Sequence, residues 1–245
     1  MNKNIKIITE TENYLVIDKP AGLAMHNDGF NKEETLVDWI LQFYPDLENV
    51  GEPLSLPNGK SALKPGLVHR LDKDTSGVIM IAKNQKTFYF FKNEFQTHQT
   101  QKTYRAILEG ELKLKKDEIG IIKLPIGRSR KDPRRRVASP KAFGRLREAF
   151  TEYKLLENFI DFSYIEAYPK TGRTHQLRAH FKAINHSIVC DKLYSQNSKC
   201  PPPLDRQALH AFSLEINLPE EGRKIFKAPL PTDMMVALEN LRSSC

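Results

Sequence analysis

A decapeptide dense in polar side chains, Val68 to Gly77, leads directly into the apolar run Val78 to Ala82. An apolar run of this length after a turn predicts a buried strand, so the decapeptide is expected to be a loop held at the edge of a core. The loop contains two acids, two bases, a histidine and two hydroxyl groups. A simple turn does not need this many polar side chains, because Gly77 alone supplies an unusual backbone dihedral. For the residues by themselves, a solvated turn capped by Thr75 or Ser76 is the alternative.

The chain has 245 residues, of which 40% are hydrophobic, enough for a buried core. Lys and Arg number 38 against 30 Asp and Glu, which gives a formal net charge of +8. This balance favours a polyanionic partner such as nucleic acid. Charge by itself does not separate RNA from DNA or from an anionic membrane.

The cysteines and the N-terminal residues indicate the cellular compartment. Cys190, Cys200 and Cys245 are an odd number without a CxxC pair, so neither a disulfide framework nor a zinc ribbon is expected. The histidines near them show no metal-ligand spacing, so no metal site is expected either. The N-terminus has no signal-peptide pattern, and no apolar run approaches the roughly 18 residues of a membrane span. We therefore expect a cytoplasmic protein without a membrane partner.

Hydrophobic periodicity predicts strands and helices around the loop. Thr35, Asn84 and Thr174 each precede apolar residues spaced three and four apart, so each is an expected N-cap. Residues 48–64, rich in Pro, Gly, Asn and Ser, are expected to be a loop. We expect a final helix over residues 232–241 and strands near residues 5–9, 14–18, 78–82, 102–110, 149–153, 162–168 and 212–218. The helical residues expected in the core are Leu36, Trp39, Ile40, Phe43, Phe88, Phe91, Phe95, Leu177, Phe181 and Ile184.

Two further segments are rich in polar and basic side chains. Residues 171–180 read T-G-R-T-H-Q-L-R-A-H, and a helix N-terminus beside Arg173 and His175 would hold a phosphate without any catalysis. The run from Arg128 to Arg136 has six basic residues in nine. Such a run is most often a solvated loop, but its density in a basic chain favours phosphate contact without sequence selectivity.

The central loop resembles the catalytic signature of the RluA-type pseudouridine synthases, with His69-Arg70-Leu71-Asp72 followed by Thr75-Ser76-Gly77. The segments D-K-P-x-G-L from Asp18, K-x-Y-x-A from Lys102 and G-R-T-H-Q-L-R-x-H from Gly172 resemble the same family in the expected order. The resemblance implies an α+β fold with a central mixed, mostly antiparallel sheet flanked by helices and loops. It also implies a basic active-site cleft and a single catalytic domain over residues 1–245.

The activity implied by the resemblance is conversion of uridine in ribosomal or transfer RNA to pseudouridine, without a cofactor. The C1′–N1 bond breaks, the uracil turns while bound, and C5 bonds to C1′. The resemblance assigns catalysis to Asp72, uracil packing near C5 to Tyr104, and the cation that pairs with the aspartate to Arg178. Arg70 resembles the residue that occupies the space of the flipped uridine. The expected RNA-binding residues are Arg70, His69, Arg173, His175, Arg134, Arg135 and Arg136.

The chemical role of Asp72 stays open at this stage. A carboxylate can attack the sugar, stabilise an oxocarbenium-like sugar or remove a sugar proton, and all three roles require the ionised form. The uridine must first leave its stack at a cost of a few kcal/mol. Two other functions compete: a noncatalytic RNA-binding protein on the same scaffold, and an N-glycosidase that would free uracil by hydrolysis.

One segment departs from the family pattern. Where relatives commonly read G-x-P-x-x-G-D-x-x-Y-G, this chain keeps the aspartate and the tyrosine but replaces four other residues, so the geometry of this loop is open. Many relatives also carry an N-terminal S4 RNA-binding domain, which we do not expect here, and we expect a monomer. The retained residues are Asp191 and Tyr194, and the replacements are Asn185, Ser187, Cys190 and Ser195.

Overall fold

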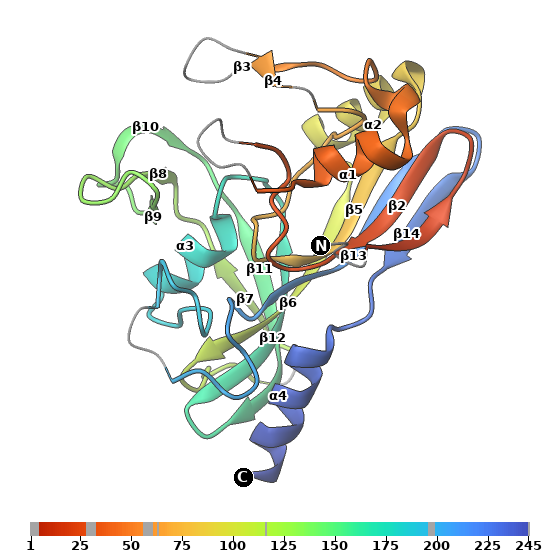
Figure 1. Ribbon diagram of the computed structural model, residues 1–245. Coiled ribbons are helices and arrows are strands. Elements are labelled where there is room, and N and C mark those ends of the chain that lie inside the picture. The colour runs from red at the N-terminus through yellow and green to blue at the C-terminus, as the bar shows by residue number, and fades with distance from the viewer. Residues whose placement is uncertain are drawn as a thin grey trace. The chain divides into compact units, whose positions relative to one another are not determined.

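The computed structural model describes residues 5–27, 33–55, 61–62, 64–115, 117–195 and 199–244. Contacts within the chain divide it into two compact units (Figure 1). The first unit comprises Met1–Thr100 and Ser213–Ala228, and the second comprises Gln101–Phe212 and Pro229–Cys245. Each unit is described by itself, and the single catalytic domain over residues 1–245 stays a prediction.

The first unit is built on a sheet that contains the predicted apolar strand. Strand β5 (Ser76–Ala82) is buried along its whole length and lies between β2 (Tyr14–Lys19) and β13 (Leu209–Leu218) in the sheet order. The edge strand β1 (Lys6–Glu10) pairs antiparallel with β2, and β14 (Gly222–Lys227) pairs antiparallel with β13. The remaining elements are α1 (Leu36–Phe43), the 3-10 helix η1 (Pro45–Leu47), α2 (Gln85–Gln96) and the two-residue strands β3 (Leu54–Ser55) and β4 (Ser61–Ala62).

Two of the predicted helix starts are confirmed in the first unit. The Thr35 side chain accepts a hydrogen bond from the Asp38 N–H, and the Asp38 carboxylate accepts one from the Thr35 N–H, which forms a capping box. Asn84 accepts a hydrogen bond of 2.9 Å from the Thr87 N–H. The expectation that Phe43 is a core residue is wrong: it ends α1, is 51% exposed and packs its ring against Trp39. Helical spacing defines a face, but it does not define where along the helix the core ends.

The second unit contains the part of the same sheet with the strand order β13-β6-β12-β11-β7. Its core lies between this sheet and two helices, and residues from both helices, such as Leu177, Phe181 and Met234, pack with the strand residues Ile107 and Ile165. The neighbouring pairs β6–β12, β12–β11 and β11–β7 are antiparallel. The elements are β6 (Gln101–Glu109), β7 (Ile119–Ile122), β11 (Thr151–Phe159), β12 (Phe162–Pro169), α3 (Gln176–Ala183) and α4 (Thr232–Ser243).

A small three-stranded sheet in the second unit was not expected from the sequence. It has the order β10-β8-β9, with β8 (Ile126–Arg128), β9 (Arg136–Ala138) and β10 (Phe143–Arg147), and α3 contacts β9 (Figure 1). The basic run is therefore mostly a loop, as expected, and this loop is the turn of a hairpin whose strands begin and end at Arg136 and Arg128. Strands of three residues surrounded by arginine carry too little alternating hydrophobicity to be detected. The segment 48–64 likewise contains β3, β4 and part of the chain outside the described residues.

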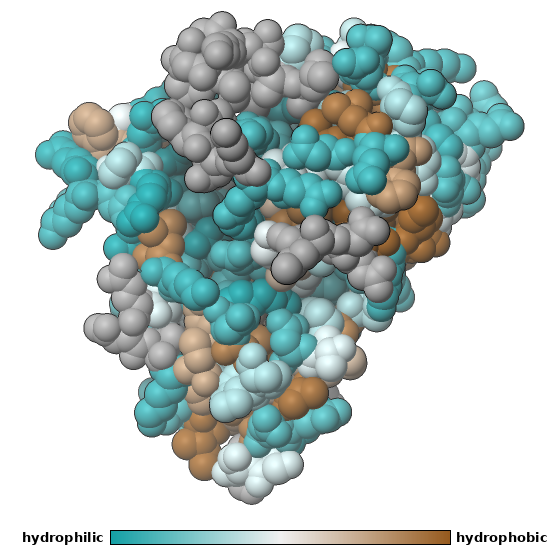
Figure 2. Space-filling model, viewed as in Figure 1, coloured by the Kyte–Doolittle hydropathy of each residue, from teal (hydrophilic) through white to brown (hydrophobic). Residues whose placement is uncertain are grey.

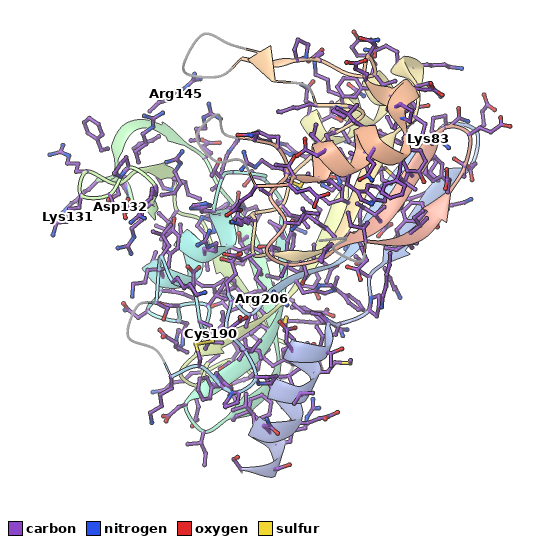
Figure 3. All side chains as sticks on the ribbon, viewed as in Figure 1. Lys83, Lys131, Asp132, Arg145, Cys190 and Arg206 are labelled. Carbon is purple, nitrogen blue, oxygen red and sulfur yellow. A yellow bond between two sulfur atoms is a disulfide. The ribbon has the colours of Figure 1, made fainter. Side chains whose placement is uncertain are left out.

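The start of α3 and the cysteines correct two expectations. The N-cap of α3 is His175, in the left-handed region at φ 54°, and not Thr174, because a turn in which the Gln176 N–H bonds the Arg173 carbonyl precedes the helix. Cys190 and Cys200 form a disulfide with Cα atoms 5.3 Å apart, and Cys190 is labelled in Figure 3. Counting cysteines did not detect this pair, because the return of the chain to Cys190 is a tertiary feature.

The surface is typical of a protein that carries many charges. The face drawn in Figure 2 is mostly hydrophilic, with smaller hydrophobic patches between hydrophilic residues. Within the described ranges, no helix is both long and apolar enough to cross a membrane.

Candidate active site

The loop that carries Asp72 is anchored on both sides by buried residues of the first unit. Leu71 is 4% exposed, Thr75 is 2% exposed, and the Thr75 N–H donates to the Asp72 carbonyl at 3.1 Å. Gly77 adopts φ 119°, which confirms the expected need for an unusual dihedral where the loop enters β5. The Asp72 side chain is half-buried, between the buried Leu71 and the exposed Lys73.

A buried lysine holds the same loop from β2. Lys19 is fully buried, and its ammonium group donates hydrogen bonds to three backbone carbonyls: Pro20 at 2.8 Å, Leu23 at 2.9 Å and Lys73 at 3.0 Å. A buried charge is stable only when it is well hydrogen-bonded, and three carbonyl dipoles provide this. The D-K-P-x-G-L segment therefore has a physical role, which is to fix the backbone next to Asp72.

His69 and Arg70 precede the aspartate and differ in burial. His69 accepts a hydrogen bond on Nε2 from the Met80 N–H at 2.9 Å and stacks on Phe95 with ring centroids 4.5 Å apart. Both contacts hold His69 against residues of the first unit, and the predicted contact of His69 with RNA stays a prediction. Arg70 is exposed and lines an open hollow together with Lys64, Met25 and Leu67 among others. Burial, and secondarily the charge of Arg70, lowers the pKa of Lys64.

In the second unit, Arg178 is held by a buried carboxylate that the sequence did not indicate as its partner. Its Nε donates to Asp191 Oδ2 at 2.6 Å and its Nη2 to Oδ1 at 2.8 Å, while Asp191 is fully buried. This bidentate geometry fixes the plane of the guanidinium group. Asp72 lies in the first unit, so its pairing with Arg178 stays a prediction.

Three more polar residues of the G-R-T-H-Q-L-R-x-H segment belong to one hydrogen-bond network. The Gln176 side chain accepts hydrogen bonds from the Arg173 N–H at 3.0 Å and the Thr171 hydroxyl at 2.7 Å, and donates to Thr151 Oγ1 at 3.1 Å. His180 Nε2 donates to the Leu124 carbonyl, so its Nδ1 accepts from the Thr151 hydroxyl at 2.9 Å. Burial lowers the pKa of His180, which keeps the ring neutral. The network orients the start of α3.

Tyr104 lies on β6, opposite Ala167 of β12, and packs partly buried against the core of the second unit. Lys102 lies two residues earlier, so its side chain leaves the same face of the strand. Burial lowers the pKa of Lys102 to about 8. A β-carbon placed on Gly172 would lie 4.0 Å from Lys102 Nζ, so this cation adjoins the turn before α3. Lys102 is a candidate that our sequence reasoning missed, although the same-face spacing in K-x-Y was visible.

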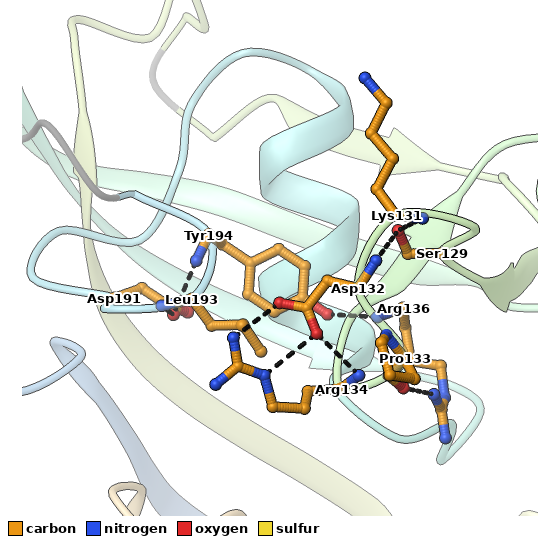
Figure 4. A network of polar contacts seen from close by, with 9 residues as sticks. All are labelled: Ser129, Lys131, Asp132, Pro133, Arg134, Arg136, Asp191, Leu193 and Tyr194. Carbon is orange, nitrogen blue, oxygen red and sulfur yellow. Dashed lines mark hydrogen bonds and ion pairs between the residues drawn. The ribbon is translucent and has the colours of Figure 1, made fainter.

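The basic hairpin, defined as β8, β9 and the turn 129–135, is ordered by its own side chains (Figure 4). Ser129 Oγ accepts from the N–H groups of Lys131 and Asp132, both at 3.2 Å. The Asp132 carboxylate accepts two hydrogen bonds from the Arg134 guanidinium, at 3.0 and 2.8 Å. The Arg134 contact lowers the pKa of Asp132. Of the predicted phosphate-binding arginines, Arg134 and Arg135 therefore lie on a structured turn, and Arg136 begins β9.

Antiparallel pairing of β10 with β8 adds two cations that the sequence reasoning did not include. Arg145 and Arg147 lie on β10 and are exposed, and Arg147 pairs with Ile126 of β8. Figure 3 labels Lys131 in the turn of the hairpin and Arg145 on β10. The charged surface is thus wider than the run 128–136. Only the fold brings the two segments together.

The described residues contain no group of three or more His, Cys, Asp or Glu side chains placed to hold a metal ion. The chemistry that the two units do present is a carboxylate on a clamped loop, a guanidinium fixed by a second carboxylate, and a basic surface.

Comparison with known proteins identifies the family. The family model described as RNA pseudouridylate synthase matches residues 13–183, which is more than half of the chain. The chain belongs to the RNA pseudouridylate synthase family. It is 37% identical over 92% of its length to an uncharacterized RNA pseudouridine synthase of Chloroflexus aurantiacus, and 35% identical over 99% to ribosomal large subunit pseudouridine synthase D of Borreliella burgdorferi. The chain covers 66% and 70% of these two proteins, so it spans about two thirds of their length.

A solved structure shows that the fold is shared with the family. The human RNA pseudouridylate synthase domain containing 1 protein matches 98% of this chain and 96% of its own, with a TM-score of 0.71 at 22% identity. The expected α+β pseudouridine synthase fold is therefore confirmed. Asp72, Tyr104 and Arg178 all lie within the range matched by the family model.

Proposed function

We propose that this protein converts uridine in RNA to pseudouridine, with Asp72 as the catalytic carboxylate. The observation that carries the proposal is the Asp72 loop, clamped by Lys19 and Thr75 in a chain that belongs to the family. Such clamping preorganises a reacting group, which is the main way a protein lowers a barrier without a cofactor. The reaction breaks C1′–N1, forms C1′–C5, releases the C5 proton to solvent and protonates N1 from solvent, so atoms balance without a redox partner.

Each unit supplies separate groups to this proposal. Arg178, fixed by Asp191, would provide positive charge near the carboxylate, and Tyr104 would pack on the uracil. Arg70, Arg173, His175 and the arginines of the basic hairpin would hold phosphates. The charge of +8 supports an RNA partner, because the energy of phosphate neutralisation supplies much of the affinity for nucleic acid.

Large-subunit ribosomal RNA is the first substrate to test, since relatives at 33–35% identity carry that RNA in their names. Transfer RNA is the second. The experiment uses each RNA with tritium at uridine C5 and measures label released to water by the wild type, by Asp72→Ala and by Asp74→Ala, a matched control in the same loop. We expect release by the wild type and the control, and a loss of at least 1,000-fold for Asp72→Ala.

The products separate isomerisation from the other functions. A synthase leaves pseudouridine in the RNA, whereas an N-glycosidase frees uracil, and a binding protein retains the RNA without releasing tritium. Equal release by the wild type and Asp72→Ala would remove Asp72 from the mechanism. Absence of release from both RNAs, with binding retained, would contradict the proposed activity.

A further inference from the structure

A short turn in the second unit connects Arg178 with the basic hairpin. In this Asp191 turn, residues 191–194, the Asp191 carboxylate accepts hydrogen bonds from the N–H groups of Leu193 at 3.0 Å and Tyr194 at 3.1 Å. The Asp191 carbonyl accepts from the N–H groups of Tyr194 at 3.1 Å and Ser195 at 2.7 Å. Since one buried residue holds the next several backbone groups, the turn is locally rigid.

One side of the turn fixes Arg178. The same Asp191 carboxylate that caps the turn accepts both bonds from the Arg178 guanidinium, at 2.6 and 2.8 Å. Burial strengthens such a charge-assisted pair, and losing either partner leaves a charge in a poorly solvated site. The Asp191 carboxylate therefore fixes the plane of the Arg178 guanidinium group.

The other side of the turn fixes the basic hairpin (Figure 4). The Tyr194 hydroxyl accepts a hydrogen bond of 2.7 Å from the Arg136 N–H and lies 3.1 Å from His175 Nδ1. The Arg135 guanidinium lies 5.2 Å from the centre of the Tyr194 ring, and that of Arg178 lies 5.0 Å from it. Tyr194 is 3% exposed, so its side of these contacts is shielded from water.

We propose that Asp191 and Tyr194 are positioning residues with separable tasks. Asp191 orients the guanidinium of Arg178 for the chemical step, whereas the Tyr194 hydroxyl holds Arg136 and His175 where they contact RNA phosphates. This inference rests on the proposed function. It predicts that Asp191 controls kcat, whereas Tyr194 controls the affinity for RNA.

The test compares conservative variants with matched controls. Asp191→Asn removes the charge and Tyr194→Phe removes only the hydroxyl, while Asp161→Asn and Tyr168→Phe are the same changes elsewhere in the second unit. We expect Asp191→Asn to lower kcat at least tenfold with RNA affinity within twofold. Tyr194→Phe should weaken RNA affinity three- to tenfold with kcat within twofold. The controls should change neither constant by more than twofold.

A replacement variant and a measurement that does not depend on activity complete the test. If Asp191→Asn does not fold, Asp191→Ser replaces it, because a serine hydroxyl still caps the turn but carries no charge. Solvent exchange of the Arg178 Nε proton, followed by NMR, reports its orientation independently of activity and should accelerate in either Asp191 variant. A wild type without tritium release would contradict the proposed function, and proton exchange and RNA affinity would still test the positioning roles. Parallel loss of both constants in both variants, or loss in neither, would overturn the inference.

Discussion

The buried ammonium group of Lys19 donates a hydrogen bond of 3.0 Å to the backbone carbonyl of Lys73, 54 residues later in the chain. The same ammonium group also donates to two carbonyls in the bend that follows β2. One side chain therefore joins the end of β2 to the loop that contains Asp72. Backbone carbonyls that lose a buried donor cost about 1–3 kcal/mol each, so this contact is expected to matter for both folding and catalysis.

Lys19→Met should destabilise the protein by about 3 kcal/mol and lower tritium release at temperatures where the variant remains folded. The reason is that methionine fills the space but leaves three carbonyls without the ammonium donor. Urea unfolding gives the stability and the tritium assay gives the activity. Lys6→Met, on the exposed edge strand β1, is the control and should change neither; a stable and fully active Lys19→Met variant would contradict the clamp.

Lys102→Met should raise stability at neutral pH while lowering RNA modification. The folded-state pKa of Lys102 is lowered from 10.5 to about 8, so burying its charge opposes folding at pH 7. The difference corresponds to at most about 3 kcal/mol, and this cost disappears as pH rises from 8 to above 10.5. Urea unfolding at pH 7 and pH 10 measures the effect, with Lys113→Met as the exposed control. A variant less stable than the wild type at pH 7 would show that the charge is well solvated.

His180 should make stability fall in mild acid. Its folded-state pKa is lowered below 6.5, so the folded protein binds fewer protons than the unfolded chain in this range. The stabilisation is complete above pH 6.5 and is lost as pH falls through the folded-state pKa, with a slope of at most about 1.4 kcal/mol per pH unit. His180→Gln should reduce stability at pH 7 and flatten the dependence between pH 7 and 5. Parallel curves for the variant and the wild type would exclude His180 as the source.

The double variant Arg134→Ala and Arg145→Ala should weaken RNA binding through phosphate contacts alone. Each lost contact is expected to reduce the slope of log affinity against log salt concentration by about 1, so the slope should fall by about 2. kcat at saturating RNA should stay within twofold. Filter binding at several salt concentrations measures the slope, and Lys86→Ala on α2 is the exposed control. An unchanged slope would place the RNA elsewhere.

Loss of the Cys190–Cys200 disulfide should destabilise the folded chain by about 2 kcal/mol, because the bond closes a loop with a sequence separation of 10. Cys200→Ser should show this loss without reductant and should not respond to dithiothreitol, whereas the wild type should lose stability when the reductant is added. Cys245→Ser should behave as the wild type in both conditions. A wild type that ignores the reductant would argue against the bond in solution.

Local patterns in the sequence were sufficient for much of the fold. The caps at Thr35 and Asn84, the buried strand β5 and the loop before it depend on residues close in sequence, since helix and turn hydrogen bonds span only a few positions. The contiguous motif around Asp72 identified the family for the same reason. The start of α3 was predicted one residue too early, because the preceding turn uses Gln176 and not Thr174 as its anchor.

The partners of the functional side chains were decided only by the tertiary structure. The carboxylate that holds Arg178 lies 13 residues further along the chain, and Arg145 reaches the basic hairpin through pairing of β10 with β8. Composition and periodicity indicate whether a side chain is buried, but they do not indicate which residue from a distant part of the chain contacts it. A buried lysine, an aspartate–arginine pair and a disulfide therefore appear only once the chain has folded, because each is a contact between segments whose separation in sequence carries no periodic signal.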